Sequence, residues 1–355
     1  VAFLLSADQL VMTTDFLATS PVWVDILGVI TGTLHNVVAT ATGEAYVTST
    51  DGLWYCANFF DAASTWTLVL EPIDAETALA GANAGTLPSD YTARFGALNV
   101  NDSGLVCAAV HIEAGGGPTT RGILYYGSAL SWTSFTLPSW WDNIPPLVER
   151  PLIIPSVIGQ NHCIGRHDND FLICCGQSAG YAPTVIRTAE FAGWNMYPFY
   201  VGIQGMVINC CERGFTAASP EVEGDIWQDY NRYNLIAGTS IFHQFGLSSI
   251  GSNYLYLDPG GNNDLWLNNV LLAEAETVFG VGSDGGRAVF FPNDYTQIAW
   301  VTRTNTGAGN IIVYSDDIGA TWQSKNGNLL AVLGANWTGE TAPSRGNAVV
   351  YVLEV

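Results

Sequence analysis

The sequence predicts an all-β fold built from repeated four-stranded units, and three observations carry this prediction. Apolar residues make up 48% of the chain and occur mostly in short β-rich runs, without the spacing of an amphipathic helix. The 38 Gly and 15 Pro are spread along the chain and separate these runs, as tight turns between many strands require. A hairpin-like segment that ends in Trp recurs about every 45–65 residues, which is typical of repeat arrays.

The apolar runs, taken in order, predict about seven units. Residues 1–27 supply three strands of the first unit, and residues 345–355 supply its missing strand. Pairing the two chain ends would close a ring and protect exposed sheet edges, so residues 1–355 are expected to form one domain. Six units remain an alternative, because no recurring hairpin segment marks residues 204–277. The other predicted units are 30–72, 92–140, 150–201, 204–247, 248–277 and 279–332.

Residues 315–322 read Ser-Asp-Asp-Ile-Gly-Ala-Thr-Trp and form the clearest motif in the chain. Asp and Gly favour turns, and Ser and Thr hydroxyls bond nearby backbone groups, so the motif predicts a locked hairpin. The pattern S-x-D-x-G-x-T-W is the Asp-box, and the chain resembles the sialidase-like β-propellers that carry it. The resemblance implies that the units are propeller blades and that the box is a structural staple. The five matching residues are Ser315, Asp317, Gly319, Thr321 and Trp322.

Eroded copies of the box follow other strand-like runs. Asp61, Thr65 and Trp66 keep the second half of the pattern, with Ala63 where Gly belongs. The segment from Thr13 to Thr19 keeps the first hydroxyl, the Asp and the Thr. Segments 128–132 and 188–194 keep only the turn and the Trp. The copies therefore predict where the outer hairpin of each blade lies.

The charge balance excludes several classes of partner. Eleven Lys and Arg face 32 Asp and Glu, which gives a formal net charge of −21. Nucleic acids and anionic membranes need compensating cations, so neither is an expected partner. No apolar run reaches the length of about 18 residues that a transmembrane helix needs. Only 12% of residues are charged, which favours an extracellular, cell-surface or virion protein, and an oligomer or larger assembly stays open.

An enzyme of the sialidase type is the alternative that the resemblance implies. Such an enzyme needs three arginines around a carboxylate, a Tyr activated by a Glu, and an acidic Asp. Its first arginine usually lies in an R-I-P-like motif near the N-terminus, whereas the first arginine here is Arg94 in Thr-Ala-Arg-Phe. Because no motif selects a catalytic set, the sequence predicts no catalytic residue.

One acidic segment with an interleaved aromatic residue is the best candidate for a ligand-binding loop. Carboxylates beside an aromatic ring suit sugar binding, and the same carboxylates could form a weak Ca²⁺ site. Residues 258–264 are rich in oxygen ligands but lack the spacing of an EF-hand loop, so no cofactor or metal is predicted. The candidate loop consists of Glu221, Glu223, Asp225, Trp227 and Asp229.

Seven cysteines cannot all pair within one chain. The vicinal pairs 174–175 and 210–211 lie in strand-like runs, which favours small buried side chains. A disulfide between Cys163 and Cys174 across one hairpin is the alternative. Asn101-Asp-Ser and Asn336-Trp-Thr match the N-glycosylation sequon.

Together these features favour a non-enzymatic β-propeller with a recognition or structural role, binding a glycan or protein partner. The 12 Trp and 15 Tyr could supply flat surfaces for either partner. A sialidase-like glycoside hydrolase or lyase is the main alternative. A third option is an assembly-factor propeller similar to the photosystem-assembly or sortilin types, which also carry Asp-boxes.

Overall fold

A computed structural model gives the fold of the chain. Its strands belong to seven four-stranded antiparallel sheets among the described residues. The described residues are 1–6, 8–61, 64–75, 77, 91–101, 103–114, 121–135, 164–167, 170–175, 184–189, 193–197, 207–211, 214–218, 225–229, 233–236, 245–250, 253–258, 264–268, 270–280, 282–283, 285–291, 294–302, 309–333 and 349–353.

The first three sheets, named blades 1 to 3, cover the two chain ends and the first third of the chain. In blade 1 the C-terminal strand β28 pairs antiparallel with β1, with Ala2 opposite Val352 and Leu5 opposite Val349. From first to fourth, the strands of blade 1 are β28 (Val349–Val352), β1 (Ala2–Leu5), β2 (Leu10–Thr13) and β3 (Val24–Asp25). Those of blade 2 are β4 (Leu34–Ala39), β5 (Ala45–Ser49), β6 (Gly52–Cys56) and β7 (Trp66–Leu70). Those of blade 3 are β8 (Tyr91–Val100), β9 (Val106–Ala114), β10 (Arg121–Ser128) and β11 (Ser131–Phe135).

Blades 4 to 7 repeat the same strand order. Short helices follow the last strands of blades 6 and 7, namely α2 (Ala275–Phe279) and α3 (Leu329–Leu333). The strands are β12 (Ile164–His167), β13 (Asp170–Cys175), β14 (Thr184–Ala189) and β15 (Gly193–Tyr197); β16 (Val207–Cys211), β17 (Gly214–Ala218), β18 (Asp225–Asp229) and β19 (Tyr233–Ile236); β20 (Phe245–Ile250), β21 (Asn253–Asp258), β22 (Asp264–Leu267) and β23 (Val270–Ala273); β24 (Gly285–Phe291), β25 (Asp294–Thr302), β26 (Ile312–Ser315) and β27 (Gln323–Ser324).

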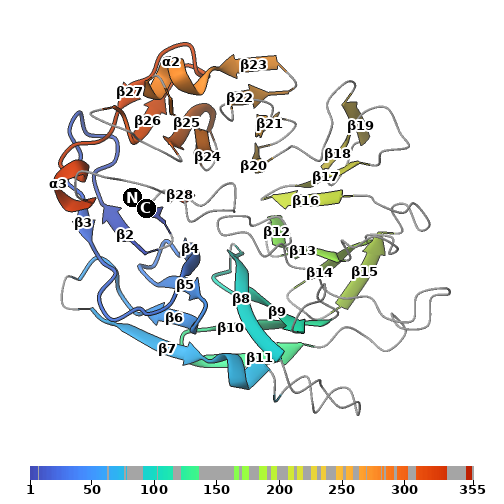
Figure 1. Ribbon diagram of the computed structural model, residues 1–355. Helices are drawn as coiled ribbons and strands as arrows, with labels where there is room; N and C mark the ends of the chain where they lie inside the picture. The colour runs from blue at the N-terminus through green and yellow to red at the C-terminus, as the bar shows by residue number, and fades with distance from the viewer. Residues whose placement is uncertain are drawn as a thin grey trace.

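The blades follow one another around a common centre (Figure 1). The first strand of each blade lies innermost and contacts the first strand of the next blade, from β4 through β8, β12, β16, β20 and β24 to β28, which also contacts β4. This arrangement is a β-propeller, and it confirms the predicted fold class with seven blades rather than six. The predicted unit boundaries agree with the sheets except at Tyr91 and residues 245–247, which lie just outside their predicted units.

The hydrophobic core lies between neighbouring blades, and this explains the continuous apolar runs in the sequence. Successive side chains of a strand point to opposite faces. In β1, Ala2 and Leu4 pack towards blade 7, whereas Phe3 and Leu5 pack towards blade 2. Blade 1 is thus covered on both faces, so its inner strand can be apolar at every position.

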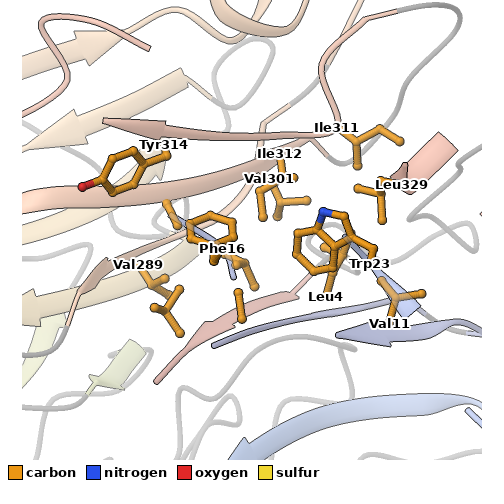
Figure 2. Packing of buried hydrophobic residues seen from close by; sticks show 14 of the residues in the cluster. Leu4, Val11, Phe16, Trp23, Val289, Val301, Ile311, Ile312, Tyr314 and Leu329 are labelled. Atoms are coloured by element: carbon orange, nitrogen blue, oxygen red, sulfur yellow. The ribbon is translucent and has the colours of Figure 1, made fainter. Parts of the chain in front are cut away.

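The junction between blades 7 and 1 joins the two ends of the chain. Figure 2 shows Phe16 and Trp23 of blade 1 packed against Val301, Ile312 and Tyr314 of blade 7. The Phe16 ring lies 6.1 Å from Trp23 and 6.2 Å from Tyr314 between centroids, both edge to face. The connection between β2 and β3 therefore covers the last blade.

Candidate functional site

Residues 315–322, called the box below because they match the Asp-box pattern, form the connection between β26 and β27. The Ser315 hydroxyl donates to Oδ1 of Asp317 at 2.8 Å and accepts the amide of Gly319 at 2.7 Å. Thr321 donates its amide to Oδ1 of Asp317 at 2.8 Å and its hydroxyl to Oδ2 at 2.7 Å. Every polar member of the motif thus has a partner inside the motif.

These bonds determine what the Asp317 carboxylate can do. The Thr321 hydroxyl, then the Thr321 amide and the Ser315 hydroxyl, hold the pKa of Asp317 below its ordinary value of 3.8. Both carboxylate oxygens already accept hydrogen bonds and the group stays ionised at neutral pH. Asp317 is therefore suited to locking the hairpin and unsuited to acting as a general acid.

The last two features of the box connect it to its surroundings. Trp322 is half-buried and its ring lies 5.6 Å from that of Trp300 in the same blade. Gly319 has a φ of 76°, and a Cβ there would lie 2.8 Å from Cγ of Leu272 in β23. The box therefore folds on its own blade and contacts blade 6.

The copy at residues 13–19 keeps the core of the box geometry. Thr13 donates its hydroxyl to Oδ1 of Asp15, and the same oxygen accepts the amide of Val22 at 3.1 Å. The Thr13 hydroxyl is the main reason that the pKa of Asp15 is lowered. In the box, the Asp carboxylate accepts the amide of the Thr four residues later, and Thr19 was expected to donate the corresponding amide here. This connection is longer than the box, so the Asp15 carboxylate accepts the amide of Val22 instead. Because of this greater length, the sequence pattern did not identify the buried Trp23 as the counterpart of Trp322.

The copy at residues 61–66 keeps its Trp and part of its turn. Asp61 accepts the amide of Ser64 through its backbone carbonyl at 2.9 Å, and Thr65 is exposed. Trp66 is buried and donates its indole N–H to the carbonyl of Ile26 in blade 1 at 2.6 Å. Ala63, which replaces the motif glycine, lies outside the described residues.

All five box-like segments lie between the third and fourth strands of their blades, namely blades 1, 2, 3, 4 and 7. Four of them contact the preceding blade. The contacts are Trp23 Nε1 to the Lys325 carbonyl (3.0 Å), Trp66 Nε1 to the Ile26 carbonyl (2.6 Å), the Ala129 amide to Tyr46 Oη (2.9 Å), and Gly319 against Leu272. These hairpins therefore hold neighbouring blades together.

The structure places three residues of the predicted acidic ligand loop in a strand. Asp225, Trp227 and Asp229 lie within β18, the third strand of blade 5, and are not loop residues. The alternation of polar and apolar residues in this segment is typical of a strand as well as of an acidic loop, and residues 225–229 form a strand. Glu221 and Glu223 lie outside the described residues.

A different group of side chains combines rings and a carboxylate where blades 2 and 3 meet. We call Glu44, Tyr46, Tyr55 and Trp132 the junction platform. Tyr55 donates its hydroxyl to Oε1 of Glu44 at 2.9 Å. The Tyr46 ring is fully buried and lies 5.2 Å from the Tyr55 ring and 5.9 Å from the Trp132 ring. Glu44, Tyr55 and Trp132 are half-buried, so they remain accessible at the surface.

The platform phenols are neutral at physiological pH. Desolvation, followed by the hydrogen bond to Glu44, raises the pKa of Tyr55 to about 12. Desolvation also raises the pKa of Tyr46. A Tyr–Glu hydrogen bond is also the contact by which a Glu activates a Tyr nucleophile, so this pair alone does not separate a binding site from a sialidase-like one. Such an enzyme would also need three arginines. Of the ten in the chain, Arg94, Arg121, Arg166, Arg187 and Arg287 lie in strands, and the other five lie outside the described residues.

Other predicted features have definite environments. Asn101 of the first sequon is 3% exposed, and its Oδ1 accepts the amide and hydroxyl of Ser103 and the amide of Leu105, so it is a turn residue that a glycan could not reach. Cys56 and Cys107 are buried free thiols, and desolvation raises the pKa of both. Cys163 and Asn336 lie outside the described residues.

The described residues offer neither a cluster of metal ligands nor a membrane-spanning helix. No three side chains of His, Cys, Asp or Glu in this part of the chain are grouped so that they could hold a metal ion. No helix in the same part is both long and apolar enough to cross a membrane. The weak Ca²⁺ site considered from the sequence stays untested.

Comparison with known proteins yields similarity at the level of structure alone. No family model and no curated protein matches the chain. A structure of YCF48 bound to D1 peptide is 14% identical and aligns over 84% of this chain and 83% of its own, with a TM-score of 0.46. YCF48 from Cyanidioschyzon merolae is 13% identical over 82% and 84%, with a TM-score of 0.44. The BP39L lectin from Burkholderia pseudomallei is 11% identical over 91% and 93%, with a TM-score of 0.45.

Proposed function

We propose that the protein is a non-enzymatic β-propeller that recognises a glycan outside the cell or on a virion surface. One observation carries this proposal: the face that bears the outer hairpins exposes Leu17, Phe60 and Leu130, while the carboxylates of Asp15 and Asp317 accept hydrogen bonds within their own hairpins. Such a face offers apolar contact area, and these two carboxylates are unsuited to acting as general acids.

The hairpins share one face because of the strand order. In an antiparallel sheet of consecutive strands, the connection between strands one and two lies at the same end of the strands as the connection between strands three and four. In blade 2 the amide of Phe59 donates to the carbonyl of Gly43 at 2.8 Å, and in blade 7 the amide of Ile318 donates to the carbonyl of Thr296 at 3.0 Å. The first bond joins the two kinds of connection, and the second joins the outer hairpin to the start of β25. We call this surface the hairpin face.

The tips of three consecutive hairpins each expose one large apolar side chain. Leu17 of blade 1 is 58% exposed, Phe60 of blade 2 is 44% exposed and Leu130 of blade 3 is 70% exposed. Exposed apolar side chains grouped on one face favour a binding surface. The acidic composition and low share of charged residues support the proposed location outside the cell.

A glycan array and a glycosidase screen on the same purified sample test the proposal. We expect binding to at least one glycan and no release of sugar from any substrate in the screen. Turnover of a glycan would show the sialidase-like alternative to be correct. If no glycan binds and a defined protein ligand is captured, the partner is a protein and not a glycan.

A further inference from the structure

We infer that the junction platform of Glu44, Tyr46, Tyr55 and Trp132 binds the ring of a neutral sugar. This inference rests on the proposed function and adds to it a location and a ligand class. The platform combines two accessible aromatic rings with one accessible carboxylate, and both kinds of group contact a sugar in different ways. The rings suit the C–H faces of a pyranose, and the carboxylate suits its hydroxyl groups.

The two accessible rings are held in fixed positions, Tyr55 by its hydrogen bond to Glu44 and Trp132 by its contacts with residue 129. Ala129 adopts a positive φ of 50°, and its amide donates to Tyr46 Oη while its carbonyl accepts the Trp132 indole N–H at 2.9 Å. Because the indole N–H of Trp132 is already bonded within the protein, the ring itself is what remains for a ligand. Fixed rings lose little conformational entropy on binding, which favours affinity.

The carboxylate is also positioned, but it keeps one oxygen for a ligand. The Thr40–Glu44 turn is fixed by the amide of Thr40, which donates to the Glu44 carbonyl at 2.9 Å, and by the amide of Glu44, which donates to Thr40 Oγ1 at 3.2 Å. Oε1 of Glu44 accepts the Tyr55 hydroxyl, whereas Oε2 has no hydrogen-bond partner among the described residues. Oε2 can therefore accept from the hydroxyl groups of a sugar.

Charge decides between neutral and acidic sugars. Desolvation and the neighbouring Glu44 keep Tyr55 neutral, so the platform itself supplies a negative charge and no cation. The chain as a whole carries a formal charge of −21. A sialic acid, uronic acid or sulfated sugar would be repelled by the Glu44 carboxylate, so the ligand class is a neutral hexose or its disaccharide.

The test measures binding of methyl glucoside, methyl galactoside, methyl mannoside, cellobiose and lactose by saturation-transfer NMR and calorimetry. We expect Trp132→Ala and Glu44→Gln each to weaken the best neutral ligand about tenfold, the change expected for one lost ring contact or one lost hydrogen bond to a charged group. Tyr295→Phe is the matched control, because Tyr295 is exposed on β25 in blade 7 and lies apart from the platform.

A second readout separates a binding role from a structural one. Glu44→Gln removes the negative charge with little change in shape, so it should reduce the preference for methyl glucoside over glucuronic acid. A variant that merely perturbed the fold would weaken both ligands equally. If Trp132→Ala fails to fold, Glu44→Gln alone still decides the outcome.

The outcomes distinguish this inference from the proposed function. If the protein binds glycans but the two platform variants bind as tightly as wild type, the propeller still recognises glycans and the platform is not the site. Preference for acidic sugars would also overturn the inference. If no glycan binds at all, the proposed function falls together with it.

Discussion

Gly319 shows how far the box at residues 315–322 depends on the absence of one side chain. Its φ of 76° is in the left-handed region, which Gly adopts without strain, and the neighbouring Leu272 leaves no room for a Cβ. Gly104 provides a useful comparison, since it has a φ of 83° but no atom within 4 Å of the place that a Cβ would occupy. The two glycines therefore separate backbone strain from steric overlap.

We predict that Gly319→Ala destabilises the protein more than Gly104→Ala does. Gly104→Ala should lower the free energy of unfolding by about 1–2 kcal/mol through backbone strain alone. Gly319→Ala should cost about 1–3 kcal/mol more, because Leu272 must move away from the new methyl group. Chemical denaturation of both variants measures the difference. Equal effects would mean that the box does not pack against blade 6 as described.

At the level of the element, the outer hairpins act as clasps between blades, and the clasp of blade 1 on blade 7 uses several polar side chains. Lys325, which follows β27, is 2% exposed, and its Nζ donates to the carbonyls of Leu17 and Ala18 at 3.2 and 3.0 Å. The same ammonium lies 5.2 Å from the centroid of the Tyr314 ring. Asn328 bonds both the amide and the carbonyl of Trp23.

Lys325→Met should loosen this clasp. The substitution keeps the length of the side chain but removes both hydrogen bonds to the blade 1 connection, so we expect a loss of about 1–3 kcal/mol in stability. Hydrogen exchange should increase in residues 16–23 and stay unchanged in β9 and β10. Lys325→Arg, which keeps a donor and a charge, is the control. Unchanged stability and exchange in the Met variant would rule out the clasp.

The hairpins were predictable where the motif kept its spacing. Residues 315–322 match the pattern at every required position, and the turn chemistry of Ser, Asp, Gly and Thr determines the bonds locally. In blade 1 the connection is longer, and Asp15 caps Val22 rather than Thr19. A pattern with fixed spacing could find Thr13 and Asp15 but could not find Trp23.

At the scale of the whole molecule, the sequence predicted the fold better than the site. Strands such as β1 are covered on both faces, so their continuous apolar runs between Gly and Pro signals were a sufficient guide. The junction platform depends on tertiary structure instead. The β5–β6 register places Tyr46 opposite Tyr55, and Trp132 comes from the next blade, so no local spacing could indicate the group. That residues 1–355 form one domain stays a prediction.

A crystal structure of the protein with the tightest neutral sugar from the binding panel would locate the ligand. We expect the sugar ring against Tyr55 and Trp132, with a hydroxyl group within hydrogen-bonding distance of Glu44 Oε2, and an intact glycosidic bond. A sugar bound at the centre of the propeller among arginine and carboxylate side chains would contradict this expectation.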